Sequence, residues 1–144
     1  MYNRYLITGS TGFLGRAIIE KLVRRNVRVD ALVLRNDPYA ALLPEEVHTV
    51  IGDVCEDDSL ERFFADADNN TCVIHCAGII SVASRSGSKL YQVNIGGTCK
   101  VIRQCLEHHI GKMIYVSSVH AIPEKPKNCV ITEDCEFSPG LVDG

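Results

Sequence analysis

Short apolar runs alternate along the chain with stretches in which apolar residues recur every three or four positions. The runs are too continuously apolar to be exposed edges, so they predict buried strands. These strands lie at residues 4–8, 27–34, 47–51, 71–75 and 112–117. The helical spacing predicts long helices at residues 12–25 and 90–109. Asp58 and Glu61 predict a capping box at the start of a shorter helix. The apolar residues of that helix are Leu60, Phe63 and Phe64.

Three glycines spaced by two residues each follow the first predicted strand. Gly9 allows a sharp turn out of the strand, Gly12 leaves room for a pyrophosphate beside the backbone, and Gly15 lets the next helix approach the sheet. The unpaired amides at the start of that helix attract phosphate groups. The sequence therefore predicts a dinucleotide-binding loop, which consists of Gly9, Ser10, Thr11, Gly12, Phe13, Leu14 and Gly15.

The order of strand, glycine loop, helix and strand defines a β-α-β unit. Such crossovers are right-handed and pair their strands in parallel. Strands that are apolar on both faces need helices on both sides of the sheet. We therefore predict an α/β fold of the Rossmann type, a doubly wound parallel sheet with strand order 3-2-1-4-5 and helices on both faces.

The composition is that of one globular domain, with 144 residues of which 46% are hydrophobic. The net charge of -3 lacks the broad basic footprint of a nucleic-acid-binding protein, so we expect no nucleic-acid partner. The first residues do not resemble a signal peptide, and no apolar run approaches the length of a membrane span. We therefore expect a cytoplasmic protein that does not bind a membrane.

The seven cysteines are scattered without a C-x-x-C pair, and most lie in apolar segments. Reduced, buried thiols are therefore expected. Cys72, His75 and Cys76 suggest a metal cluster, but alternation along a strand places the two cysteines on one face and the histidine on the other. We predict no metal site.

The loop from Thr8 to Gly15 resembles the nucleotide loop of the extended short-chain dehydrogenase/reductases, also called the NAD-dependent epimerase/dehydratase family. Residues 75–78, 93–98 and 117–118 resemble other segments of that family, in the family's order. The resemblance implies a nicotinamide dinucleotide as cofactor and hydride transfer as the chemistry.

The resemblance also implies roles for single residues near the cofactor. It places Asp53, which is followed by Val54, beside the adenine ring. The small residues after the fourth strand, Cys76, Ala77 and Gly78, would let the backbone pass under the cofactor. A turn-capping carboxylate is the alternative for Asp53.

Three polar residues are implied to act near the reacting atoms. Asn94 is polar among apolar neighbours in a helix, and the resemblance suggests an ordering role behind the active site. Ser117 and Ser118 end the fifth strand at the same edge as the glycine loop. The resemblance implies that Ser118 is catalytic and hydrogen-bonds the reacting oxygen of the substrate, whereas a simple turn is the alternative.

The cofactor is expected to be NADP or NAD, and one arginine bears on the choice. Arg35 follows the last apolar residue of the second strand, where an arginine would meet a 2'-phosphate, so it favours NADP. A solvated loop arginine is the alternative. Asp30 lies in the middle of the strand and is not expected to reach the ribose.

The family's Tyr-x-x-x-Lys pair is absent, because no tyrosine in the chain is followed four positions later by lysine. We expect residues 1–144 to be a dinucleotide-binding domain that ends before this pair and before a C-terminal substrate domain, and to be inactive alone. One function is the NAD(P)-binding portion of an oxidoreductase, epimerase or dehydratase that acts on a sugar nucleotide or a small carbonyl or alcohol. The alternative is a non-catalytic NAD(P)-binding regulatory module. A small-molecule substrate is the expected partner, and a homodimer remains an option.

Overall fold

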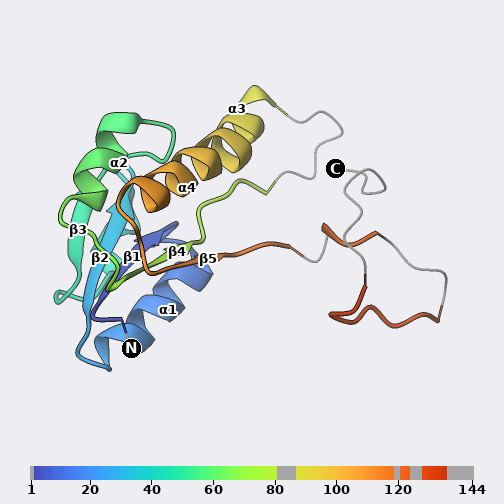
Figure 1. The fold of residues 1–144 in the computed structure, drawn as a ribbon, viewed down its shortest axis with the longest axis horizontal. Coiled ribbons are helices and arrows are strands. Elements are labelled where there is room, and N and C mark those ends of the chain that lie inside the picture. Colours follow the sequence, from blue (N-terminus) through green and yellow to red (C-terminus); the bar gives the residue numbers. More distant parts are fainter. Residues whose placement is uncertain (1, 81–86, 119–120, 124–127, 136–144) are drawn as a thin grey trace.

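The computed structural model describes residues 2–80, 87–118, 121–123 and 128–135, and its core is a layered α/β domain (Figure 1). The strands are β1 (Arg4–Thr8), β2 (Arg28–Val33), β3 (His48–Ile51), β4 (Thr71–His75) and β5 (Lys112–Tyr115). The helices are α1 (Phe13–Val23), η1 (Ala40–Leu42), α2 (Asp57–Phe64), α3 (Ser88–Tyr91), η2 (Gln92–Gly97) and α4 (Thr98–Glu107).

The five strands form one parallel sheet in the order β3-β2-β1-β4-β5. In the central strand, Ile7 lies between Ala31 of β2 and Ile74 of β4. The predicted fold class and strand order are confirmed. Because the strands are parallel, all of them end at the same edge of the sheet, where ligands bind in open α/β folds.

Helices cover both faces of the sheet, with α1 on one side and α2 and α4 on the other (Figure 1). Alternate residues of β1 show this division, because Leu6 packs under α2 and α4 whereas Ile7 packs under α1. The core under α2 and α4 contains Leu60, Phe63 and Phe64, all fully buried.

The predicted capping box at Asp58 is wrong. Helix α2 begins at Asp57, and its N-cap residue is Glu56, with no hydrogen bond from the cap side chain to the helix backbone. The Glu56 amide instead donates to the Asp53 carbonyl, and the Ser59 hydroxyl donates to the Glu56 carboxylate at 2.7 Å. The turn after β3 therefore starts the helix two residues before the position that the pattern indicated, since Asp58 as N-cap would make Ser59 the first helical residue.

The long helix predicted at residues 90–109 is continuous from Ser88 to Glu107, but its middle is not α-helical. Segment η2 (Gln92–Gly97) is a π-helical turn between α3 and α4. A Cβ atom at Gly97 would lie 2.7 Å from a methyl carbon of Val54, so the helix approaches the loop after β3 closely at this glycine. Such turns are rare and often occur at functional sites.

A buried carboxylate joins β1, β2 and β3. Asp30 is fully buried and accepts hydrogen bonds from Arg4 Nε at 2.7 Å, from His48 Nδ1 at 2.6 Å and from Arg28 Nη2 at 3.2 Å. Burial alone would raise the pKa of the Asp30 carboxyl, but the hydrogen bonds from Arg4, His48 and Arg28 outweigh it and lower the pKa. Arg4 also donates to the Ala65 carbonyl at 2.8 Å after α2, which ties the sheet to the helix layer.

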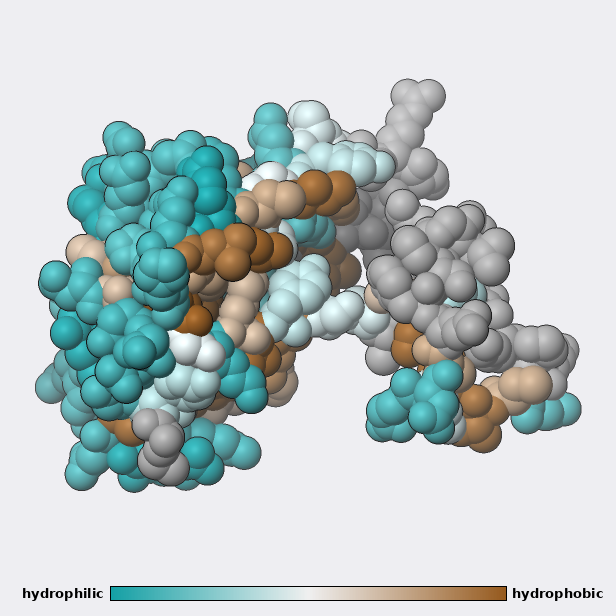
Figure 2. All heavy atoms as spheres, viewed as in Figure 1, coloured by the Kyte–Doolittle hydropathy of each residue, from teal (hydrophilic) through white to brown (hydrophobic). Residues whose placement is uncertain are grey.

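The surface is mostly hydrophilic over α2, whereas hydrophobic side chains gather along the helix that runs through α3 and α4 (Figure 2). The exposed apolar residues of this helix are Tyr91, Ile95, Ile102 and Leu106. In the described part of the chain, no helix combines the length and the apolar character needed to cross a membrane.

Candidate cofactor site

The glycine loop joins the end of β1 to the start of α1. Gly9 has a φ of +64°, in the left-handed region that favours glycine. A Cβ atom at Gly9 would lie 2.6 Å from the Ala77 nitrogen and from the Cys76 carbonyl carbon. The loop therefore packs directly on the backbone that follows β4, and no side chain fits between them.

The other two glycines of the loop have different surroundings. A Cβ atom at Gly15 would overlap the Gly9 carbonyl oxygen, so a glycine is needed there for α1 to pack against the loop. Gly12 is exposed, its backbone is extended, and a Cβ atom there would come no closer than 3.2 Å to the Gly9 oxygen. A Cβ atom at Gly12 would therefore need a small shift of the Gly9 oxygen, far less than the overlap at Gly15 would require.

Two hydroxyl groups hold the loop in place. The Ser10 hydroxyl is buried and donates to a backbone carbonyl of β2 at 2.6 Å, so it is turned away from solvent. The Thr11 hydroxyl donates to Asp37 Oδ2 at 2.7 Å. The side chains of Phe13 and Leu14, at the start of α1, are 88% and 44% exposed.

A cavity of ≈ 380 Å³ lies at the C-terminal edge of the sheet beside this loop. Eight predicted residues line it: Gly9, Thr11, Gly12, Asp53, Val54, Cys76, Ala77 and Gly78. Its other lining residues were not predicted as site residues; they are Leu32, Leu34, Gly52, Ile79, Lys89 and Val93. The lining residues of this cavity include one acid, Asp53, and one base, Lys89, and the rest are small or apolar.

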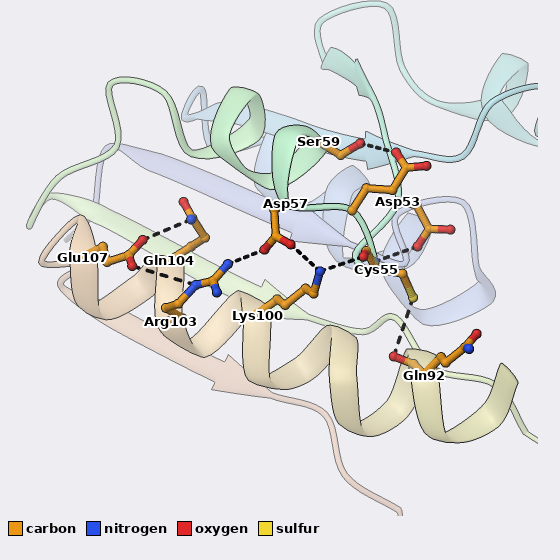
Figure 3. Close-up of polar contacts among 10 residues, drawn as sticks. Asp53, Cys55, Asp57, Ser59, Gln92, Lys100, Arg103, Gln104 and Glu107 are labelled. Atoms are coloured by element: carbon orange, nitrogen blue, oxygen red, sulfur yellow. Dashed lines mark hydrogen bonds and ion pairs between the residues drawn. The ribbon is translucent and has the colours of Figure 1, made fainter. Parts of the chain in front are cut away.

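The loop after β3 is tied to helix α4 (Figure 3). The Cys55 amide donates to Asp53 Oδ1 at 2.9 Å. Lys100 reaches across from α4, and its Nζ donates to the Cys55 carbonyl at 2.9 Å and to Asp57 Oδ2 at 2.5 Å. Arg103 forms a second ion pair with Asp57. Ion pairs this exposed add little stability each, but together they hold the loop that carries Asp53 at the cavity.

The segment after β4 forms the floor of the cavity and is held at both ends. At one end, the Ala77 amide donates to Thr8 Oγ1 at 3.3 Å. At the other end, Asn94 Oδ1 accepts from the Ile79 amide at 2.7 Å, and Asn94 Nδ2 donates to the Ile79 carbonyl at 2.9 Å. Gly78 lies between these two anchors and lines the cavity.

A buried histidine lies behind this floor. His75 Nδ1 is 2.6 Å from Thr8 Oγ1, its Nε2 is 3.0 Å from Thr98 Oγ1, and its ring stacks on Tyr115. Burial lowers the pKa of His75 to about 4, so the ring is neutral near pH 7. The histidine is thus a buried hydrogen-bonding group rather than a charge in the site.

The depressed pKa of His75 predicts a loss of stability in mild acid. In the unfolded chain this histidine takes up a proton near pH 6.5, whereas the folded chain resists protonation down to about pH 4. The neutral ring therefore makes its full contribution to the free energy of unfolding above pH 6.5. This contribution, about 3 kcal/mol, is lost as the pH falls to 4. Urea unfolding of wild type and His75→Asn between pH 7 and pH 4 would measure it. His109→Asn is the control, because His109 is exposed and has a positive φ that asparagine also adopts. Equal slopes for wild type and His75→Asn would contradict the prediction.

Eight of the sixteen predicted site residues do not line the main cavity; they are Ser10, Phe13, Leu14, Gly15, Arg35, Asn94, Ser117 and Ser118. Arg35 lines an adjoining cavity of ≈ 370 Å³ at the ends of β2 and β3, together with Arg62, Ser59 and Glu56 of the α2 region. The two cavities share Leu34, Gly52 and Asp53. Ser117 and Ser118 follow β5 at the C-terminal edge of the sheet, where both are exposed.

Lys89 and Val93 also line the cavity, although neither was predicted as a site residue. They are four residues apart in a helical segment, so they lie on the same face of it. Nothing in the sequence pattern indicated that this face closes the cavity, because the contact joins segments far apart in the chain.

The cysteines do not form a metal centre in the part of the chain that the structure describes. No three histidine, cysteine, aspartate or glutamate side chains come close enough there to hold a metal ion. All seven thiols are free. Burial raises the pKa of Cys72 and Cys76, and it raises the pKa of Cys105 to about 11, which makes these thiols poor nucleophiles.

Comparison with known proteins gives a family and a set of solved folds. The model of the 3-beta hydroxysteroid dehydrogenase/isomerase family matches residues 6–138. Human 3 beta-hydroxysteroid dehydrogenase type 7 is 30% identical over 130 residues, which are 85% of this chain and 34% of the relative. Short-chain dehydrogenase/reductase family 42E member 1 of Macaca fascicularis is 30% identical over 119 residues, 81% of this chain and 30% of the relative. The chain thus spans about a third of these relatives.

Two solved structures have the same fold. The UDP-glucose 4-epimerase of Thermus thermophilus, solved in complex with NAD, has a TM-score of 0.83 and 25% identity, over 96% of this chain and 45% of the epimerase. The structure of gox2253 has a TM-score of 0.82 and 24% identity, over 97% of this chain and 42% of that protein.

Proposed function

The chain belongs to the 3-beta hydroxysteroid dehydrogenase/isomerase family, and on this basis we propose that it is the NAD(P)-binding part of an oxidoreductase. The resemblance to the extended short-chain dehydrogenase/reductases is confirmed by this family and by relatives of that name. The observation that carries the proposal is the cavity at the C-terminal edge of the sheet, which Gly12 of the glycine loop lines together with Asp53 and Gly78.

The cavity suits an extended dinucleotide. The amides at the start of α1, next to the glycine loop that lines the cavity, would bind the pyrophosphate. Asp53 and Val54 follow β3, on one side of β1, and would contact the adenine. Ala77 and Gly78 follow β4, on the other side of β1, and would lie under the nicotinamide half. When bound, the nicotinamide would supply a site that gives or takes a hydride.

The substrate class we propose is a secondary alcohol or its ketone. Relatives that match the chain are named as hydroxysteroid dehydrogenases, which favours a hydroxysteroid over a sugar nucleotide or a small carbonyl compound. Ser118 lies at the C-terminal edge and would donate a hydrogen bond to the reacting oxygen. An alcohol of such high pKa can align that oxygen but cannot deliver its proton near neutral pH.

A second candidate is a regulatory module that binds NAD(P) without turnover. Both candidates require dinucleotide binding, and only the first requires hydride transfer by the whole protein.

The adjoining cavity leads us to propose NADP as the preferred cofactor. Arg35 and Arg62 both line it, and it shares Asp53 with the cofactor cavity, so a 2'-phosphate there would meet two guanidinium groups. Arg35→Ala and Arg62→Ala are expected to weaken NADPH binding about tenfold and NADH binding less than about twofold.

Fluorescence titration of the chain with NADPH and NADH tests both points. Arg25→Ala, at the exposed end of α1, is the control and should change neither affinity. Equal weakening of both cofactors by Arg35→Ala would contradict the preference for NADP. If the wild-type chain bound neither dinucleotide, the proposed function itself would be wrong.

A further inference from the structure

A row of hydrogen bonds through three side chains runs behind the floor of the cofactor cavity. It begins at Thr8, at the end of β1, and passes through His75 of β4 to Thr98 of α4 and then to the backbone of Asn94 in the π-helical turn. The two ends of this row are the two groups that hold the floor, since Thr8 Oγ1 accepts from the Ala77 amide and the Asn94 side chain pairs with Ile79.

The hydrogen bonds of this row can run in only one direction from donor to acceptor. The Thr98 hydroxyl donates its hydrogen to the Asn94 carbonyl at 2.7 Å, so towards His75 it can act only as an acceptor. His75 Nε2 must then carry the hydrogen, at 3.0 Å from Thr98 Oγ1. A neutral ring with hydrogen on Nε2 has a bare Nδ1, which accepts from the Thr8 hydroxyl at 2.6 Å.

Each of the three side chains is therefore used once as donor and once as acceptor. The Ala77 amide donates to Thr8, Thr8 donates to His75, His75 donates to Thr98, and Thr98 donates to Asn94. Thr8 and His75 are fully buried, so a missing member would leave its neighbours without a partner and away from water.

We propose that His75 and Thr98 are positioning residues that set the floor of the cofactor cavity, by joining the glycine-loop strand to the π-helical turn that holds Ile79. The proposal rests on the proposed function, because it assigns these residues to the same dinucleotide site. Neither residue lines the cavity; they act through the Ala77 and Ile79 amides. If these two residues had only a structural role, their substitution would destabilise the whole sheet rather than the floor of the cavity alone.

Three measurements test the proposal, and the first two use Thr98→Val and Thr98→Ser. Valine keeps the shape of threonine without the hydroxyl, whereas serine keeps the hydroxyl. Thr98→Val is expected to speed hydrogen exchange of the Ile79 amide about tenfold and to weaken NADPH binding about tenfold, while Thr98→Ser restores both. Thr49→Val, on the exposed edge strand β3, is the matched control and should change neither.

The third measurement is the ¹⁵N chemical shift of the His75 ring in the wild-type chain. Nε2 should appear protonated and Nδ1 bare. Three results would each overturn the proposal. The first is a hydrogen on Nδ1 instead of Nε2. The others are equal hydrogen exchange of the Ile79 amide in Thr98→Val and Thr98→Ser, and faster exchange spread evenly over the whole sheet. If wild type binds no dinucleotide, the proposed function fails, while the exchange pattern and the ring shifts still decide whether the row of hydrogen bonds sets the floor.

Discussion

Gly12→Val is expected to abolish dinucleotide binding while leaving the chain folded. The backbone at Gly12 is extended, a conformation that valine adopts readily, and the nearest protein atom to a new Cβ is the Gly9 oxygen at 3.2 Å. The branched side chain would point into the space where a pyrophosphate must approach the backbone. Fluorescence titration with NADPH should show a loss of affinity of about a hundredfold or more, on the order of 3 kcal/mol. The chain should keep its cooperative thermal transition, because the contact at 3.2 Å requires only a small shift of the Gly9 oxygen.

Gly15→Val is the matched comparison, because it adds the same side chain three residues further on. Its Cβ would overlap the Gly9 carbonyl oxygen, so α1 could not pack on the loop and the chain should lose its cooperative thermal transition. The pair thus separates a glycine required by the ligand from one required by the fold. If Gly12→Val bound NADPH as tightly as wild type, the pyrophosphate would not bind at this loop. If Gly12→Val failed to fold, the fold would require this glycine as well.

Asp30→Ala should lower the free energy of unfolding by about 3–5 kcal/mol at pH 7. The change leaves the Arg4 side chain, of which only 9% is exposed, without its carboxylate partner between the sheet and α2. The lowered pKa of Asp30 means that its ionised form stabilises the fold above the ordinary carboxyl pKa, and this stability is lost as the pH falls through the lowered value. Urea unfolding at pH 7 measures the loss.

The double variant Arg4→Leu with Asp30→Leu is the control for the buried ion pair. Replacing both partners by apolar residues removes the uncompensated charge, so much of the lost stability should return. A single variant Asp30→Ala as stable as wild type would show that water reaches Arg4 and that the carboxylate is not essential. Cofactor affinity should not change in a folded double variant, because Asp30 does not line the cofactor cavity.

The sheet and the glycine loop were predictable because their signals are local. Runs such as residues 71–75 are largely apolar, which indicates a strand covered on both faces, and the spacing of three glycines defines the loop without reference to the rest of the chain. Asp30 shows a limit of prediction from local pattern. It lies in mid-strand as expected, but its partners on β1 and β3 come from 26 and 18 residues away and leave no periodic pattern.

The parts of the site that could not be predicted depend on contacts between distant segments. His75 and Thr98 are 23 residues apart, and Lys100 meets Cys55 across 45 residues. The start of α2 was misplaced because Asp58 and Glu61 fit a capping pattern, whereas the turn at Asp53 determines where the helix begins. The π-helical turn gave no sequence signal apart from two adjacent glycines.

The π-helical turn also constrains which changes in length this helix can accept. A π turn contains one residue more than the α turn it replaces, so loss of a single residue between Gln92 and Gly97 would convert it to regular α-helix. In a helix of about 3.6 residues per turn, one residue corresponds to a rotation of about 100°. A deletion there would remove Asn94, displace it, or change its spacing to Thr98, and these are the two residues that hold Ile79 and His75. Insertions and deletions should therefore be tolerated better at the C-terminal end of α4 than within η2.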